Sequence, residues 1–244
     1  MKDSQTRTAL VTGGAIRVGR EIALALAGAG CDVAVHYGSS ADEARETCEE
    51  IRRLGGKSES FCADLSASGQ AEALIDAVVQ KMGKLDILVN SAATMLRTPV
   101  GKVTAEDWEK TMNLNLRAPF FLSQAAAKVM QPRGGVIINI ADLAAFETWS
   151  NYIPHSISKA GVVQMTRALA HALAPSIRVN AIAPGAVLLP ANWSKESAEN
   201  LTETTPLKRL GSPKDVTGAL LYLLDAEYVT GETIVVDGGR HVRK

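Results

Sequence analysis

The chain has 244 residues, of which 46% are hydrophobic and 21% charged, an ordinary balance for a globular protein. Lys plus Arg and Asp plus Glu number 26 each, so no net charge favours binding to nucleic acid or to a membrane surface. No apolar run approaches the roughly 18 residues of a membrane span, and the first residues lack the apolar segment of a signal peptide. Cys31, Cys48 and Cys62 form no metal-binding pair. We therefore expect a cytoplasmic protein without a metal site.

Strand and helix patterns alternate along the whole sequence, without a repeat or a linker. Continuous apolar strands separated by helices predict an α/β fold, in which helices cover both faces of a parallel sheet. We expect one domain, residues 1–244, with a doubly wound seven-stranded Rossmann sheet whose ligands lie outside the carboxyl ends of the strands. The expected strands are 8–12, 32–36, 57–63, 85–90, 136–141, 177–182 and 233–236, and the expected helices are 17–29, 41–54, 67–82, 104–113, 114–130, 154–173 and 213–224.

A glycine-rich turn, residues 12–19 (TGGAIRVG), follows the first expected strand and opens the first helix. Gly13 permits a sharp turn and Gly19 lets helix and strand approach closely, while the helix N-terminus offers N–H groups to a pyrophosphate. In isolation such a stretch could be a plain tight turn. Its position between a strand and a helix predicts a dinucleotide site.

The second expected strand ends without an acidic residue, in Val35-His36-Tyr37-Gly38-Ser39-Ser40. Proteins specific for NAD place Asp or Glu there, on the ribose hydroxyls. A carboxylate would repel a 2′-phosphate, whereas Arg17, His36, Ser39 and Ser40 could hold one. We therefore expect NADP or NADPH as the cofactor. In the alternative interpretation, Arg17 only covers the end of its helix.

Residues 151–161 (NYIPHSISKAG) resemble the active-site segment of the short-chain dehydrogenase/reductase family, Y-x-x-[SA]-K-A. Ser158-Lys159-Ala160 match this pattern, but His155 stands at the Tyr position. Asp142, thirteen residues upstream, stands where most members carry Ser. The glycine turn resembles the family's T-G-x-x-x-G-x-G, with Arg17 in place of the middle glycine.

Further motifs of the same family follow in order along nearly the whole chain. Residues 64–65 (DL) resemble an adenine-binding pair, although a helix N-cap would explain Asp64 equally well. Residues 90–93 (NSAA), 180–185 (NAIAPG) and 235–239 (VVDGG) resemble motifs after later strands. The resemblance, with the reasoning on NADP, implies these cofactor-binding residues: Gly13, Arg17, Val18, Gly19, His36, Ser39, Ser40, Asp64, Leu65, Asn90, Ala92, Lys159, Pro184 and Gly185.

The resemblance also implies a catalytic set. In the family, a Tyr exchanges the substrate proton, a Lys binds the nicotinamide ribose and an Asn completes the relay, which points to Lys159 and Asn115 here. His155 lies four residues before Lys159 on the same helix face, and an imidazole exchanges protons near neutral pH. We expect His155 to be the proton donor, oriented by Asp142. The alternative is that His155 is a polar filler, with Asp142 acting alone or the enzyme inactive.

Asp142, together with Arg17 and the His-Tyr-x-x-Ser stretch at residues 36–40, resembles the pteridine reductase branch of the family. Residues 237–243 (DGGRHVR) are similar to the C-termini of bacterial dihydromonapterin reductases. This resemblance implies NADPH-dependent reduction of a dihydropterin. The alternatives are a carbonyl or 3-oxoacyl-thioester reductase of the same family, and a catalytically silent NADPH-binding sensor or assembly protein.

Three residues are predicted to line the substrate site. Met95 stands where pteridine reductases stack an aromatic ring on the pterin, and Tyr152 is expected to be a wall of the site. Trp193 lies in residues 186–206, at the place of the family's substrate lid. Family resemblance further implies a homotetramer, or a homodimer, that pairs through the helices within 104–130 and 154–173.

Overall fold

Seven parallel strands form one sheet in the computed structural model, which describes residues 6–189 and 194–242. The strand order is β3-β2-β1-β4-β5-β6-β7, and every neighbouring pair is parallel. The order reverses between β1 and β4, so a cleft is expected outside the carboxyl ends of these two strands. The strands are β1 (Thr8–Val11), β2 (Asp32–Tyr37), β3 (Ser58–Cys62), β4 (Ile87–Asn90), β5 (Gly135–Ile140), β6 (Ile177–Pro184) and β7 (Thr233–Val236).

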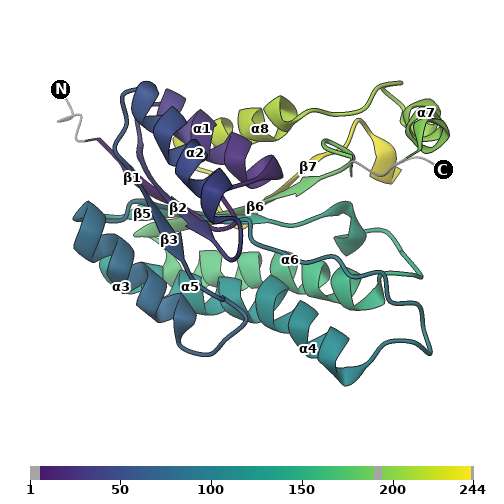
Figure 1. The fold of residues 1–244 in the computed structure, drawn as a ribbon, viewed down its shortest axis with the longest axis horizontal. Helices are drawn as coiled ribbons and strands as arrows, with labels where there is room; N and C mark the ends of the chain where they lie inside the picture. The colour runs from purple at the N-terminus through teal and green to yellow at the C-terminus, as the bar shows by residue number, and fades with distance from the viewer. Residues whose placement is uncertain (1–5, 190–193, 243–244) are drawn as a thin grey trace.

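Helices cover both faces of this sheet, which confirms the predicted doubly wound Rossmann fold (Figure 1). One face carries α1 (Arg17–Gly28), α2 (Ala41–Arg53) and α8 (Pro213–Asp225). The other face carries α3 (Gln70–Met82), α4 (Ala105–Met112), α5 (Ala118–Met130) and α6 (Ile153–Leu173). A capping box opens α8, with Ser212 and Asp215 exchanging side-chain and backbone hydrogen bonds.

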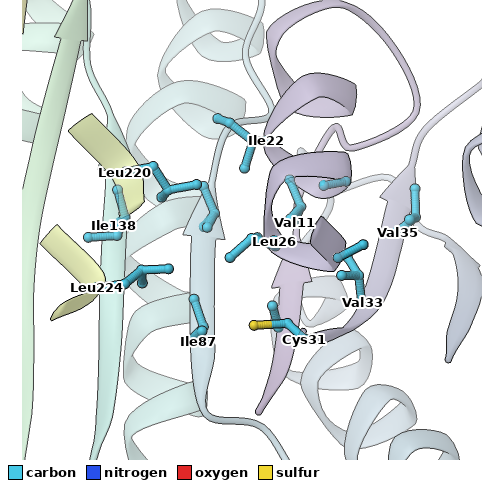
Figure 2. Packing of buried hydrophobic residues seen from close by; sticks show 14 of the residues in the cluster. Val11, Ile22, Leu26, Cys31, Val33, Val35, Ile87, Ile138, Leu220 and Leu224 are labelled. Atoms are coloured by element: carbon cyan, nitrogen blue, oxygen red, sulfur yellow. The ribbon is translucent and has the colours of Figure 1, made fainter. Parts of the chain in front are cut away.

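The two faces of the sheet carry two separate apolar clusters. Successive side chains of β1 alternate between them: Ala9 and Val11 belong to the cluster under α1 and α8, and Leu10 to the cluster under α3 and α5. Figure 2 shows the first cluster, where side chains of β1, β2, β4 and β5 meet those of α1 and α8. Each fully buried Leu or Ile side chain contributes about 2 kcal/mol to the stability of the fold.

The structure differs from the predicted elements in three places. The predicted helices 104–113 and 114–130 are joined by a π-helical turn, Asn113–Arg117. The helix predicted from residue 67 begins at Gln70, because Gly69, with a φ of 78°, ends a turn there. Inside the predicted lid, Lys195–Thr204 form a further helix, α7, in which only Leu201 is buried, so its sequence lacks an apolar stripe.

The structure shows no transmembrane helix. Within residues 6–189 and 194–242, no helix combines the length and the apolar character that crossing a bilayer requires.

Candidate active site

The glycine turn packs its backbone tightly against the start of the segment after β4. Gly13 has a φ of 63°, and a Cβ added to it would lie 3.0 Å from the Cα of Ala92. A Cβ on Gly19 would lie 2.1 Å from the carbonyl oxygen of Gly13. Among the described residues, no side chain caps the N-terminus of α1 at Ile16. The N–H groups at this helix end therefore suit the pyrophosphate of a dinucleotide, as predicted for Gly13, Gly19 and Ala92.

Thr12 ties β1 to β4 at the point where the strand order reverses. Its buried hydroxyl oxygen accepts hydrogen bonds from the N–H groups of Ser91 and Ala92, at 2.9 and 3.1 Å. The side chain of the predicted residue Val18 is partly buried and packs against the apolar cluster under α1.

Arg17 keeps the left-handed backbone of the glycine that it replaces, with a φ of 54°. Its guanidinium group donates a hydrogen bond of 2.8 Å to the carbonyl oxygen of Leu188, just after β6. Arg17 is thus in contact with the segment after β6, and its contact with a 2′-phosphate at the end of β2 stays a prediction.

His36 is buried and its ring supports the backbone of the glycine turn. Its Nδ1 accepts a hydrogen bond from the N–H of Gly13 at 3.1 Å, so Nε2 carries the proton and donates to the carbonyl oxygen of Ala63 at 3.0 Å. Burial lowers the pKa of the imidazole, which stays neutral. With both ring nitrogens engaged within the protein, the prediction of a 2′-phosphate contact rests on Ser39 and Ser40, at the N-terminus of α2.

Three further predicted cofactor residues make contacts within the protein. Asn90 is buried, and its Nδ2 donates to Oδ1 of Asn139 at 2.8 Å, which ties β4 to β5. Leu65 lies in the apolar cluster under α3. The exposed carboxylate of Asp64 accepts hydrogen bonds from the N–H and the hydroxyl of Ser66, which lower its pKa. It stabilises a turn and is not the N-cap of α3, contrary to the alternative from the sequence.

Pro184 ends β6, and Gly185 follows it in close contact with the segment after β7. The N–H of Gly185 donates to the carbonyl oxygen of Val236 at 2.9 Å, and a Cβ on Gly185 would lie 2.9 Å from the Cβ of Asp237. Only glycine fits this approach. The Pro-Gly pair therefore lies at the carboxyl edge of the sheet, as predicted.

Asn115 lies in the π-helical turn and binds the backbone of Thr94 in both directions. Its Oδ1 accepts from the N–H of Thr94, and its Nδ2 donates to the carbonyl oxygen of Thr94, each at 2.8 Å. Nδ2 also lies 3.1 Å from Oγ of Ser158 and 3.4 Å from Nδ1 of His155. A π-turn widens the helix locally and often marks a functional site. Asn115 thus joins the segment after β4 to α6, beside His155.

Lys159 is buried one helical turn after His155. Its ammonium group donates a hydrogen bond of 2.8 Å to the carbonyl oxygen of Ile140, the last residue of β5. Burial lowers the pKa of Lys159 to about 8, and the carboxylate of Asp142 opposes this shift. The ammonium group is therefore charged at neutral pH and becomes neutral in mildly alkaline solution.

His155 and Asp142 are brought together as predicted, but in an unexpected order. Nδ1 of His155 lies 3.2 Å from the carbonyl oxygen of Thr94, a pure acceptor, so this nitrogen carries a proton. Nε2 is buried, makes no hydrogen bond to any described residue, and lies 3.7 Å from Oδ2 of Asp142. Only 3% of the His155 side chain is exposed, against 26% for Asp142. The carboxylate is therefore the more accessible member of the pair.

The other oxygen of Asp142, Oδ1, accepts a hydrogen bond of 2.9 Å from the N–H of Ala144. This contact fixes the carboxylate at the start of a short 3-10 turn, Leu143–Ala145, and leaves Oδ2 directed to His155.

The predicted substrate residues lie in the segments that lead into and out of this pair. Met95 is 48% exposed after β4. Tyr152 is half-buried and forms the N-cap of α6, which begins one residue earlier than predicted, so Ile153 is helical and not extended. Trp193 lies outside the described residues. The part of the chain that the structure describes contains no cluster of His, Cys, Asp and Glu suited to a metal ion.

The sequence reasoning missed Thr94 and Trp149. The carbonyl oxygen of Thr94 accepts a hydrogen bond from Nδ2 of Asn115 and contacts Nδ1 of His155, but a backbone acceptor has no signature in the sequence. The indole of Trp149 lies over the imidazole of His155, with ring centroids 6.5 Å apart and an interplanar angle of 13°. Its only signal is an aromatic residue in a loop six positions before His155.

Known proteins share sequence and fold with nearly the whole chain. A family model described as enoyl-(acyl carrier protein) reductase matches residues 14–241. The 2-dehydro-3-deoxy-D-gluconate 5-dehydrogenase of Escherichia coli (strain K12) is 38% identical over 242 residues, which cover 96% of this chain and 94% of that protein.

Two similar solved structures contain different nicotinamide cofactors. A 7α-hydroxysteroid dehydrogenase complexed with NADH and 7-oxo glycochenodeoxycholic acid has a TM-score of 0.91 at 35% identity, covering 96% of this chain and 93% of that one. A blue fluorescent protein from a metagenomic library, in complex with NADPH, has a TM-score of 0.90 at 34% identity, covering 96% and 97%. The fold, the site geometry and these matches together show that the chain belongs to the short-chain dehydrogenase/reductase family of oxidoreductases, which use nicotinamide cofactors.

Proposed function

We propose that this protein is an NADPH-dependent reductase that resembles pteridine reductases and reduces a C=N bond of a dihydropterin. The observation that carries the proposal is the pair formed by Asp142 and the buried His155, next to Lys159 at the carboxyl edge of the sheet. Asp142 at this place is the feature that sets the chain apart from members with Ser. A carboxylate backed by an imidazole can supply a proton to a ring nitrogen near neutral pH.

The hydride that reaches the substrate carbon is supplied by the nicotinamide when it is bound. The proton would reach the substrate nitrogen from Oδ2 of Asp142, the more exposed group. The imidazolium form of His155, with protons on both Nδ1 and Nε2, would return a proton from Nε2 to Oδ2 and be left neutral with its proton on Nδ1. This order reverses the expectation from the sequence, in which His155 meets the substrate and Asp142 only orients it. Lys159 holds the ribose with its ammonium group, and Asn115 keeps His155 next to Thr94.

A second candidate function is the reduction of a carbonyl group. It is supported by the relatives, because the dehydrogenase of E. coli acts on a sugar acid, the family model is described as an acyl-carrier-protein reductase, and the steroid dehydrogenase holds a 7-oxo compound. The same proton path would then end on an alkoxide oxygen. The two candidates differ only in the substrate.

NADPH oxidation separates these candidates. We expect turnover with dihydrobiopterin or dihydromonapterin that exceeds turnover with acetoacetyl-thioesters and 2-keto sugar acids. The reverse order would support the carbonyl reductase. Tight NADPH binding without turnover on any of these substrates, unchanged in His155→Tyr, would instead support a silent binding protein.

The preference for NADPH rests on the absence of an acid at the end of β2 and on the hydroxyl groups of Ser39 and Ser40 at the N-terminus of α2. We expect a lower Kd for NADPH than for NADH in fluorescence titrations. Ser39→Asp should reverse the order, because its carboxylate repels the 2′-phosphate and can bind the ribose hydroxyls of NADH. Equal affinities in the unaltered protein would contradict this preference.

We also propose that the protein forms a homotetramer or homodimer through α4, α5 and α6. The surface between α5 and α6 is apolar, with Phe120 half-exposed beside Leu116 and Met165. Light scattering coupled to size exclusion should give a mass above that of one chain, and Phe120→Glu should lower it.

A further inference from the structure

A series of side-chain contacts leads from the C-terminal turn to the imidazole of His155. Its central member is Trp149, in the loop between Leu143–Ala145 and α6. The indole lies nearly parallel to the imidazole, with an interplanar angle of 13°, and meets the ring of Tyr152 edge-on, at 75° and 6.3 Å. Such offset and edge-on arrangements are the favourable ones for aromatic pairs.

Trp149 is held in turn by Glu147. The indole N–H donates a hydrogen bond of 2.8 Å to Oε2 of Glu147, and Oε1 of the same carboxylate lies 4.0 Å from Nε of Arg240. The side chains of Glu147 and Arg240 are only 21% and 19% exposed. A partly buried charge pair is screened less by solvent than a surface pair, so Arg240 can orient the carboxylate.

The C-terminal turn that carries Arg240 is itself anchored. Asp237 accepts hydrogen bonds from the N–H of Gly239 at 2.8 Å and from the backbone N–H and the ring of His241. The ring of His241 packs against Phe146, the neighbour of Glu147, at 6.5 Å between centroids. The turn and the loop of Trp149 are therefore in contact at two places.

His155 needs such support, because few hydrogen bonds fix its ring. Nδ1 has one contact of 3.2 Å with Thr94 and a longer one with Asn115, while Nε2 faces Asp142 at 3.7 Å without a hydrogen bond to any described residue. A small rotation of the ring would turn Nε2 away from Oδ2 of Asp142. The nearly parallel indole of Trp149, 6.5 Å away between ring centroids, limits the space for this rotation.

We infer that Trp149 is a positioning residue that keeps the ring of His155 aligned with Asp142, and that Arg240 acts on the same ring through Glu147. This inference rests on the proposed function, in which His155 replaces the proton of Asp142. Trp149 does not itself exchange a proton. By this inference, proton delivery also depends on the loop after β5, which carries Trp149, and on the C-terminal turn, which carries Arg240.

The test compares Trp149→Leu, Trp149→Phe, Glu147→Gln and Arg240→Gln, with Trp108→Leu on the exposed side of α4 as the matched control. We expect Trp149→Leu to lower kcat for NADPH oxidation about tenfold or more, since small misplacements of reacting groups are costly. The Kd for NADPH should change less than twofold, and the solvent deuterium isotope effect on kcat should rise, because proton transfer becomes slower. Trp149→Phe, which keeps an aromatic plane, should recover most of the rate.

Glu147→Gln and Arg240→Gln should give intermediate losses. Combining either with Trp149→Leu should add little, because all three act on one ring. A Trp149→Leu protein with the kcat and isotope effect of Trp108→Leu would overturn the inference while leaving the proposed function intact. If Trp149→Leu does not fold, Trp149→Phe and Glu147→Gln carry the same comparison against the control.

The ring signals of His155 in NMR spectra give a second readout that needs no turnover. They are assigned by their loss in His155→Gln. We expect them to shift in Trp149→Leu and, by smaller amounts, in Glu147→Gln and Arg240→Gln. A protein that turns over no substrate would contradict the proposed function. Independently of turnover, unchanged His155 signals in these variants would contradict the positioning of the ring by Trp149.

Discussion

Oδ2 of Asp142 lies 3.7 Å from Nε2 of His155, and the carboxylate is far more exposed than the imidazole behind it. A proton on Nε2 would direct an N–H group at Oδ2. In the proposed function, Asp142 and His155 together take the place of the single Tyr in the family's pattern.

The order of the two groups predicts how their loss affects the rate. Asp142→Asn should lower kcat by about 10²- to 10⁴-fold, the usual contribution of a general acid, and His155→Ala should cost the same or less. The double variant should be no slower than Asp142→Asn, because both residues serve one proton. Single-turnover NADPH oxidation measures these rates, with Asp76→Asn on the surface of α3 as the control.

A greater loss in His155→Ala than in Asp142→Asn would contradict this order. It would mean that the imidazole meets the substrate directly, as the sequence suggested.

Lys159 predicts an alkaline limit to activity. Burial lowers its pKa to about 8, so its ammonium group is charged below that pH and loses its proton above it. We expect kcat/KM to fall as the pH rises through about 8, because a neutral amine binds the ribose hydroxyls more weakly. Lys159→Arg should be slower at all pH values but should lack this limb, since arginine keeps its charge. A flat profile up to pH 9.5 in the unaltered protein would disprove the assignment.

At Arg17, we expect substitution by glycine to leave a more stable protein than substitution by alanine. Its φ of 54° costs a residue with a Cβ about 1 kcal/mol, and glycine adopts it freely. Arg17→Gly should therefore unfold at a higher denaturant concentration than Arg17→Ala, by about 1 kcal/mol, although both lose the contact with Leu188. At Arg45, in the interior of α2, alanine should be the more stable of the two. The same order at both positions would show that the backbone of Arg17 is unstrained.

We expect substitution of His36 by alanine to lower the affinity for both cofactors without changing the preference between NADPH and NADH. His36→Ala leaves the N–H of Gly13 without its acceptor in a largely buried turn, which costs about 1–3 kcal/mol. The affinities for NADPH and NADH should fall by similar factors, as measured by fluorescence titration, whereas Ser39→Asp should change their ratio. A selective loss of NADPH affinity in His36→Ala would indicate that His36 contacts the 2′-phosphate.

Local patterns were sufficient to predict the fold. Apolar runs such as residues 85–90, separated by helical segments, predicted a parallel sheet, because a strand buried on both faces needs apolar side chains at every position. The roles of the glycines at 13 and 19 were also predicted, since each satisfies a backbone requirement within a few residues. Helix α7 was missed, because a mostly exposed helix has no apolar stripe to reveal it.

The sequence by itself, through its resemblance to the family's motifs, determined that His155, Asp142, Lys159 and Asn115 were expected in one site. Only the tertiary structure decided where the side chains point. His36 binds Gly13 and Ala63, Arg17 binds Leu188, and Asp142 lies in front of His155. These partners lie 13 to 171 residues apart along the chain, and such contacts depend on how whole elements pack, which no local periodicity encodes.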